Sequence, residues 1–180
     1  MVVSMSFALR RRALSLAASI AVCLAVPATA GAATVVAAGS HPTVRGSHAA
    51  IINGKGYAPS KAPQAVKQVI WSANKIRHKP YKWGGGHGTW DDSGYDCSGA
   101  VSFALHGAGL LSYPLDSRGF MNWGDSGHGR WIDVWATNGH AYMTVAGIRF
   151  DTSGAGESGP RWRTERPWEQ RFWVRHPAGL

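Results

Sequence analysis

One cysteine of this chain stands in a context that suits nucleophilic chemistry. Cys97 lies in the run Asp96-Cys97-Ser98-Gly99, directly before an apolar stretch with helical spacing. Backbone N–H groups at the start of a helix favour a thiolate, and they also stabilise an oxyanion that forms beside it. We therefore expect Cys97 to act as a nucleophile. The alternative is that Cys97 is a small buried side chain without a chemical role.

A nucleophilic thiol needs a base and a group that orients that base. His140 follows a predicted turn at Asn138-Gly139 and opens a predicted strand, and Asp151 ends the next strand. An antiparallel pair that turns at Ala146-Gly147 would place positions 140 and 151 nearly opposite each other. We expect His140 to be the base and Asp151 to orient its ring, with Thr152 as the alternative orienting residue.

The start of the chain is typical of an export signal. Three arginines precede an apolar stretch over residues 13–26, which is too short to span a bilayer, and Ala28-Thr29-Ala30 is typical of a cleavage site. We expect residues 1–30 to be a signal peptide, and its removal takes Cys23 away. Cys97 is then the only thiol. Outside the cell most cysteines form disulfides, so an unpaired one indicates a chemical use.

The rest of the chain predicts one secreted or wall-associated domain. Residues 31–57 are rich in small residues and predict a flexible leader, whereas residues 58–180 suit a single monomeric domain. The net charge of +9 falls to about +6 without the signal peptide, because three of the 19 basic residues leave. This excess favours an anionic cell-wall polymer as a partner. The basic residues form no dense run, so nucleic-acid binding is not expected. The sequence has no second long apolar segment, so stable membrane insertion is not expected either.

The hydrophobic pattern predicts two helices followed by an antiparallel sheet, which is an α+β fold. The first helix is expected over residues 61–77, capped by Ser60. The second is expected from Cys97, capped by Asp96 and ended by Gly107 or Gly109. Residues 112–129 predict no regular structure. Strands are expected over residues 131–136, 140–145, 148–151 and 172–175.

Three features together resemble the NlpC-type cysteine peptidases of bacterial cell walls. They are the run Tyr81-Lys82-Trp83-Gly84-Gly85, the Asp-Cys-Ser-Gly run before a helix, and a histidine that opens a strand. The resemblance covers residues 58–155. It implies a papain-like fold with N-terminal helices packed on a small antiparallel sheet. It also implies hydrolysis of amide bonds in peptidoglycan stem peptides, typically between D-glutamate and the diamino acid, through a thioester acyl-enzyme.

The same resemblance implies roles for single residues. Cys97 is the nucleophile and His140 the base, while Tyr81, Asp96 and Ser98 match positions that line the substrate cleft. The family commonly has a histidine as its third polar residue, where this chain has Asp151 or Thr152. We expect no cofactor and no metal.

The sequence leaves two other functions open. The chain is alternatively a non-catalytic wall-binding module on the same scaffold, or an amidase or acyltransferase that uses the same thiol.

Three further histidines lack zinc-ligand spacing, and we expect them to be structural or exposed. They are His87, His106 and His128.

Overall fold

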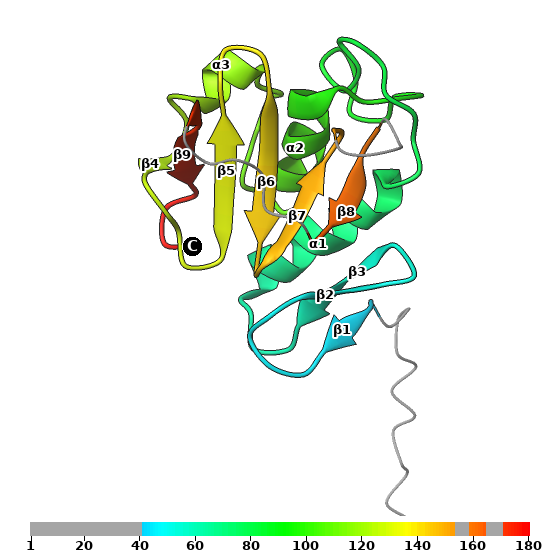
Figure 1. Cartoon of the computed structure of the whole chain (residues 1–180), viewed down its shortest axis with the longest axis vertical. Coiled ribbons are helices and arrows are strands. Elements are labelled where there is room, and N and C mark those ends of the chain that lie inside the picture. The colour runs from blue at the N-terminus through cyan, green and yellow to red at the C-terminus, as the bar shows by residue number, and fades with distance from the viewer. Residues whose placement is uncertain (1–40, 154–158, 165–170) are drawn as a thin grey trace, which may run out of the picture. The chain divides into compact units, whose positions relative to one another are not determined.

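The structure is a computed structural model of the chain, and it describes residues 41–153, 159–164 and 171–180 (Figure 1). All described residues belong to one compact unit, Ala38–Leu180. The expected signal peptide and residues 31–40 of the expected leader lie outside the described residues. No helix in the described ranges is long and apolar enough to cross a membrane.

A six-stranded antiparallel sheet forms the centre of this unit. Its order is β4-β9-β5-β6-β7-β8, and every neighbouring pair is antiparallel. The strands are β4 (Asp125–Ser126), β5 (Ile132–Ala136), β6 (Ala141–Val145), β7 (Ile148–Asp151), β8 (Arg161–Arg163) and β9 (Trp173–His176). The four predicted strands are therefore present, with bounds shifted by at most one residue.

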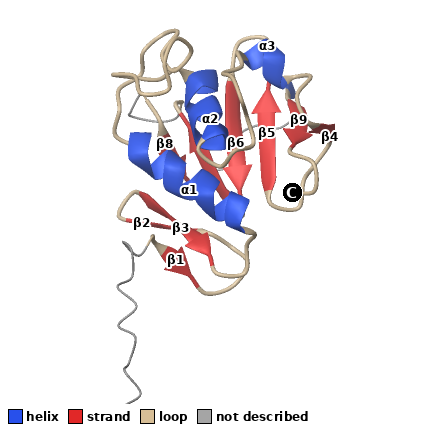
Figure 2. Ribbon diagram, turned by 180° about the vertical axis from the view of Figure 1, so that it is seen from behind, coloured by secondary structure: helices blue, strands red, loops and turns tan. Residues whose placement is uncertain are grey.

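Helices α1 (Gln64–Ile76) and α2 (Cys97–His106) lie on one face of this sheet (Figure 2). α2 contacts β6 and β7, while α1 contacts α2, β6 and β3. Apolar side chains of both helices and of the inner sheet face are buried together, among them Val66, Ile70, Val101, Leu105, Val134, Met143 and Phe150. Helices that precede an antiparallel sheet confirm the expected α+β class.

A second, three-stranded sheet occupies part of the expected leader. β1 (Thr43–Val44), β2 (Ala50–Ile52) and β3 (Lys55–Pro59) have the order β1-β3-β2. The expectation of a flexible segment over residues 31–57 is therefore wrong for residues 43–57. The turn between β2 and β3 has positive φ at both Asn53 and Gly54, a conformation that an Asn-Gly pair adopts easily. β3 contacts α1, and this contact buries Ala58 and stabilises the small sheet. Its strands are too short for the alternation of apolar and polar residues to be recognised in the sequence.

The start of α1 and the segment after α2 also differ from expectation. α1 begins at Gln64, after Pro63, and has no side-chain cap. The Oγ of Ser60 instead accepts a hydrogen bond from the backbone N–H of Gly46, so it fixes the N-terminal sheet. Within residues 112–129 the chain forms the short helix α3 (Ser117–Phe120) and β4. The carboxylate of Asp116 caps α3, a local signal that the sequence contained.

The buried amide of Asn74 joins α1 to both sheets. Its Oδ1 accepts hydrogen bonds from the backbone N–H of Gly56 in β3 at 2.8 Å and from Nε1 of Trp162 in β8 at 2.9 Å. Its Nδ2 donates to the Gly56 carbonyl at 2.8 Å. A buried polar side chain with this many partners holds three elements in one arrangement.

We expect Asn74→Ala to lower the free energy of unfolding by about 2–4 kcal/mol, because it leaves buried N–H groups of Gly56 and Trp162 without an acceptor. The measurement is urea unfolding at neutral pH. Gln64→Ala, an exposed change on the same helix, is the control and should shift stability by less than about 0.5 kcal/mol. Equal effects of the two variants would contradict this role of Asn74.

Candidate active site

Cys97 lies at the first position of α2, as the sequence predicts. Asp96 has extended backbone and caps the helix, and its Oδ1 accepts the Gly99 N–H at 2.7 Å. The first N–H groups of a helix have no partner within the helix. Since Asp96 takes the N–H of Gly99, those of Cys97 and Ser98 are left beside the thiol. The thiol is free and partly exposed.

The opposite side of the site is formed by His140 and Asp151. His140 lies at the end of the turn between β5 and β6, and Asp151 is the last residue of β7. The Nε2 atom of His140 and the Oδ1 atom of Asp151 are 3.0 Å apart. Asp151 is only 2% exposed, so the contact is shielded from water on the carboxylate side.

The pairing of β6 with β7 differs from the expected register by two residues. Val145 pairs with Ile148 and Met143 with Phe150, so the same register places position 140 opposite position 153 rather than opposite Asp151. Side chains alternate between the two faces of a strand, so a shift of two keeps Asp151 on the face of His140. The two side chains meet as diagonal neighbours instead of direct partners.

Asp151 remains ionised because several donors compensate its burial. Burial by itself would raise its pKa, but the hydrogen bond and charge of His140, the backbone N–H of Ser153 and the charge of Arg149 hold the pKa below its usual range. The guanidinium of Arg149 forms an ion pair with the second carboxylate oxygen and lies 4.8 Å from the ring centre of Tyr142. Arg149 was not expected at the site from the sequence, although a spacing of two on one strand puts it on the same face as Asp151.

His140 is the most strongly perturbed base of the site. Burial alone would lower its pKa, but the hydrogen bonds to Asp151 and Cys97 and the charges of both raise the pKa to about 9. Since Asp151 occupies Nε2, Nδ1 is the ring nitrogen that is left for the thiol. The fold thus brings Cys97, His140 and Asp151 together from α2, the β5–β6 turn and β7.

A second histidine, His87, lines the same cavity as Cys97. The Nε2 atom of His87 is 3.0 Å from Oδ1 of Asp96 and 3.3 Å from Oγ of Ser98. The hydrogen bond that His87 donates to the Asp96 carboxylate raises the pKa of His87, burial lowers it, and the charges of Asp96 and Asp116 raise it further. His87 is half-buried and paired rather than merely exposed. The only signal for His87 in the sequence was its place in the segment before the cysteine, residues 81–96, which we call the glycine-rich loop.

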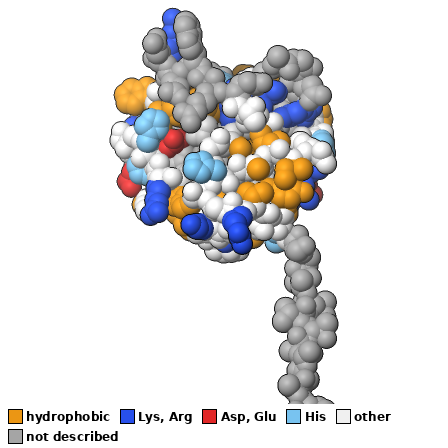
Figure 3. Space-filling view, turned by 60° about the horizontal axis from the view of Figure 1, so that its bottom comes forward, with side chains coloured by type: hydrophobic (Ala, Val, Ile, Leu, Met, Phe, Trp, Pro, Cys, Tyr) orange, Lys and Arg blue, Asp and Glu red, His pale blue; other side chains and the backbone are white. Residues whose placement is uncertain are grey.

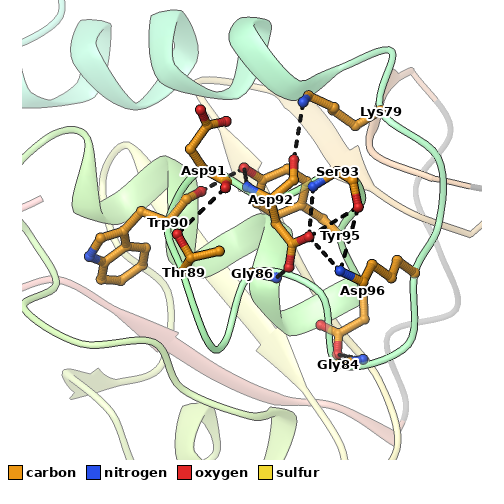
Figure 4. Close-up of polar contacts among 11 residues, drawn as sticks. Lys79, Gly84, Gly86, Thr89, Trp90, Asp91, Asp92, Ser93, Tyr95 and Asp96 are labelled. Atoms are coloured by element: carbon orange, nitrogen blue, oxygen red, sulfur yellow. Dashed lines mark hydrogen bonds and ion pairs between the residues drawn. The ribbon is translucent and has the colours of Figure 1, made fainter.

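That loop is held by the carboxylate of Asp92 (Figure 4). Oδ1 accepts from Nζ of Lys82 at 2.6 Å and Oδ2 from the backbone N–H of Gly86 at 3.1 Å, while Nζ of Lys79 donates to the Asp92 carbonyl. The hydrogen bond from Lys82 is the main cause that lowers the pKa of Asp92. Tyr95 closes the loop, because its hydroxyl donates to the carbonyl of Trp90 at 2.6 Å.

Close backbone contacts, one within this loop and one between the loop and the first turn of α2, explain two glycines of the motif. A Cβ atom at Gly99 would collide with the backbone carbonyl of Gly85, and one at Gly85 would collide with that of Gly94. The Gly85 carbonyl accepts the N–H of Asp96 at 3.2 Å, and the N–H of Gly84 donates to Oδ2 of Asp96 at 3.1 Å. The loop therefore fixes the residue directly before the nucleophile.

Cys97 opens onto a cavity of about 390 Å³. Its walls come from the glycine-rich loop, the start of α2, α3 and the β5–β6 turn. The lining residues are Trp83, Gly84, His87, Asp96, Cys97, Ser98, Asp116, Ser117, Arg118, Asn138 and Gly139. The side chain of Trp83 is 86% exposed and stands at the rim.

The three residues expected in the substrate cleft occupy different positions. Asp96 and Ser98 line the cavity, but their side chains are buried and bond to each other and to His87. Tyr81 is 38% exposed and does not line the cavity; burial and the charges of Cys97 and Asp96 raise the pKa of its hydroxyl. Over the described ranges, no group of three or more His, Cys, Asp or Glu residues is arranged to hold a metal ion.

We expect Asp151→Asn to lower the pKa of His140 below about 9, because a hydrogen bond to a charge and the charge itself are both lost. The measurement is an NMR titration of the ring protons. Because the pKa of His140 in the folded protein is raised above its ordinary value of 6.5, protonation of the ring stabilises the fold. This stabilisation is complete below about pH 6.5 and is lost as the pH rises through about 9, and the loss should be smaller in the variant. Asp125→Asn, at an exposed carboxylate of β4, is the control; an unchanged titration of His140 in Asp151→Asn would contradict the assignment.

Comparison with known proteins gives matches among solved structures alone. No family model and no curated protein sequence matches the chain. The peptidoglycan hydrolase RipB of Mycobacterium tuberculosis is 23% identical, with 65% of this chain and 69% of that chain covered and a TM-score of 0.49. A P60 domain from an antigen of M. avium subspecies paratuberculosis is 23% identical, with 62% and 94% covered and a TM-score of 0.49.

A further neighbour is RipA, a resuscitation promoting factor interacting protein, in a structure mutated at a cysteine. It is 24% identical at a TM-score of 0.49, with 63% of this chain covered. The chain spans 62% of the length of that RipA structure. The structural neighbours are thus NlpC/P60 proteins, the group that the motifs of this chain resemble.

Proposed function

We propose that this protein is a secreted cysteine hydrolase that cleaves amide bonds in peptidoglycan stem peptides. The observation that carries the proposal is the contact of a buried, ionised Asp151 with His140, beside a free thiol at the start of α2 that opens onto a cavity. The substrate class follows from the motif resemblance to NlpC-type peptidases. The basic composition and the signal-like N-terminus suit action in the cell wall.

The first half of the reaction forms a thioester. The Sγ atom of Cys97, as thiolate, attacks the carbonyl carbon of the scissile amide, and the C=O electron pair moves onto oxygen. The free N–H groups at the start of α2 stabilise this oxyanion. When the intermediate collapses, the C–N bond breaks and protonated His140 gives its proton to the departing amine.

The second half returns the enzyme to its starting state. Neutral His140 accepts a proton from a water molecule, which attacks the thioester carbon and releases a carboxylic acid and the thiolate. Asp151 fixes the ring through Nε2 and stabilises the imidazolium in both halves. No step needs a metal ion or a cofactor.

The cavity provides the surface for the peptide. Tyr81, Asp96 and Ser98 are the proposed contacts on the side of the glycine-rich loop, where Asp96 and Ser98 line the cavity. We propose the bond between D-glutamate and the diamino acid as the site of cleavage. The aromatic face of Trp83 at the rim offers apolar contact to the aliphatic part of the diamino acid.

Digestion of purified peptidoglycan tests this function directly. Wild-type protein should create new peptide ends that mass spectrometry detects, and Cys97→Ala should create none. Asp151→Asn should lower turnover by about 100-fold or more while keeping the folded state, because the imidazolium loses its partner. Asp125→Asn is the matched control, and it should retain wild-type turnover.

The products also separate the competing functions. New free carboxyl ends in the stem peptide support hydrolysis of that bond, whereas release of peptide from the glycan identifies an amidase and transfer to an added amine identifies an acyltransferase. Wall binding without new ends would leave a non-catalytic module. Cleavage by Cys97→Ala would refute the thiol mechanism.

We expect activity to fall as pH rises through about 9, because His140 then loses the proton that the departing amine requires. The thiolate itself persists at high pH. The test therefore compares two pH profiles, peptide cleavage and alkylation of Cys97 by iodoacetamide. Cleavage should decline above about pH 9 while alkylation does not, and parallel profiles would contradict the assigned role of His140.

A further inference from the structure

Positive charge is distributed very unevenly along this chain. The first acidic residue is Asp91, so residues 41–90 contain no Asp or Glu. The same fifty positions hold eight basic residues: Arg45, Lys55, Lys61, Lys67, Lys75, Arg77, Lys79 and Lys82. These positions build the three-stranded sheet, α1 and the glycine-rich loop. The end of the molecule formed by β1–β3 and α1 therefore has no carboxylate of its own.

Two cavities lie along α1, one on the side of the three-stranded sheet and one on the side of the end of α2. One of about 220 Å³ is lined by His41, Pro42, Lys55, Trp71, Asn74, Lys75 and Arg77. The other, of about 240 Å³, is lined by His41, Gln64, Gln68, Trp71, Ser72, Lys75 and Gly107. They share the lining residues His41, Trp71 and Lys75, and we call the two cavities together the α1 groove. It shares no lining residue with the cavity at Cys97.

The cations of the α1 groove are not neutralised. Among the described residues no carboxylate pairs with Lys55, Lys75 or Arg77; of the basic residues at positions 41–90, the one with such a partner is Lys82, which pairs with Asp92. Arg77 donates to the backbone carbonyl of Asn74 through Nη1. In Figure 3, which brings this end forward, Lys and Arg side chains lie along the lower part of the view.

The wall of the groove is aromatic and rigid. The ring of His41 stacks on that of Trp71 with their centres 4.3 Å apart. Nε1 of Trp71 donates to the carbonyl of Pro42 at 3.1 Å, which holds the chain over the helix. A groove lined by stacked aromatic rings and by cations without carboxylate partners among the described residues fits an extended ligand that combines apolar ring or polyol faces with negative charges.

We propose that the α1 groove binds a linear anionic polymer of the cell wall whose repeating units are joined by phosphodiesters. Lys55, Lys75 and Arg77 contact successive phosphates, and the stacked rings of His41 and Trp71 contact the sugar or polyol units between them. Binding at a groove separate from Cys97 holds the protein on the wall while the cavity engages peptides. The proposal does not depend on catalysis at Cys97.

The test measures binding to purified bacterial walls by cosedimentation, with Cys97→Ser in every protein so that the wall stays intact. Walls that carry phosphodiester-linked polymer are compared before and after cold hydrogen fluoride, which removes it. The groove variant is Lys55→Gln/Lys75→Gln. The control is Arg130→Gln/Arg171→Gln, which removes the same charge from exposed positions outside the groove.

The groove variant should bind untreated walls about 10-fold more weakly or worse, since each cation near a polyanion contributes several-fold in affinity. The control should change by less than about twofold, and extraction should weaken the parent and abolish the difference. Thermal unfolding checks that both variants fold, and Lys75→Glu alone should weaken binding further than Lys75→Gln. Equal losses in variant and control, binding that survives extraction, or stronger binding to anionic lipid vesicles than to walls would overturn the proposal.

Discussion

The site depends on a single buried electrostatic contact, that between the Asp151 carboxylate and Nε2 of His140. A carboxylate with 2% exposure is costly unless donors surround it, and here His140, Arg149 and the N–H of Ser153 do so. Because this contact occupies one ring nitrogen, it also decides which nitrogen faces the thiol. Orientation, charge and proton position of the base thus have one common cause.

A second constraint comes from backbone packing beside the nucleophile. The glycine-rich loop lies so close to the first turn of α2 that Gly99 has no room for a side chain, and its own backbone at Gly94 leaves none at Gly85. Asp96 joins both parts, since it caps the helix through Oδ1 and accepts the Gly84 N–H through Oδ2. The residues of the short motif around Cys97 are therefore needed for close backbone packing as well as for chemistry.

The two ends of the domain have different electrostatic characters. Carboxylates gather near the thiol, where each is paired with a base or a backbone N–H: Asp92 with Lys82, Asp96 with His87 and Asp151 with His140. The end formed by β1–β3 and α1 carries cations that have no carboxylate partner within the described part of the chain. Such a division suits a protein that acts on a solid, charged polymer, because attachment and chemistry then use separate surfaces.

The sequence by itself determined the parts that rest on local signals. The cap at Asp96 and the start of α2 at Cys97 follow from neighbouring residues, as do the β5–β6 and β6–β7 turns and the alternating strands around them. These signals also predicted the α+β class. The Asn-Gly pair at residues 53 and 54 and the capping residue Asp116 are equally local signals. They indicate the β2–β3 hairpin and α3, although neither element was expected.

Only the tertiary structure decided which side chains meet across elements. A register two residues from the expected one still joins His140 to Asp151, because alternation fixes the face of a strand but not its pairing. The groove beside α1 depends on contacts between segments far apart in the chain, and the hydrogen bond of His87 with Asp96 depends on how the glycine-rich loop folds against the start of α2. Periodicity and capping are properties of a few neighbouring residues, whereas these contacts exist only after the sheet, the helices and the glycine-rich loop have packed together.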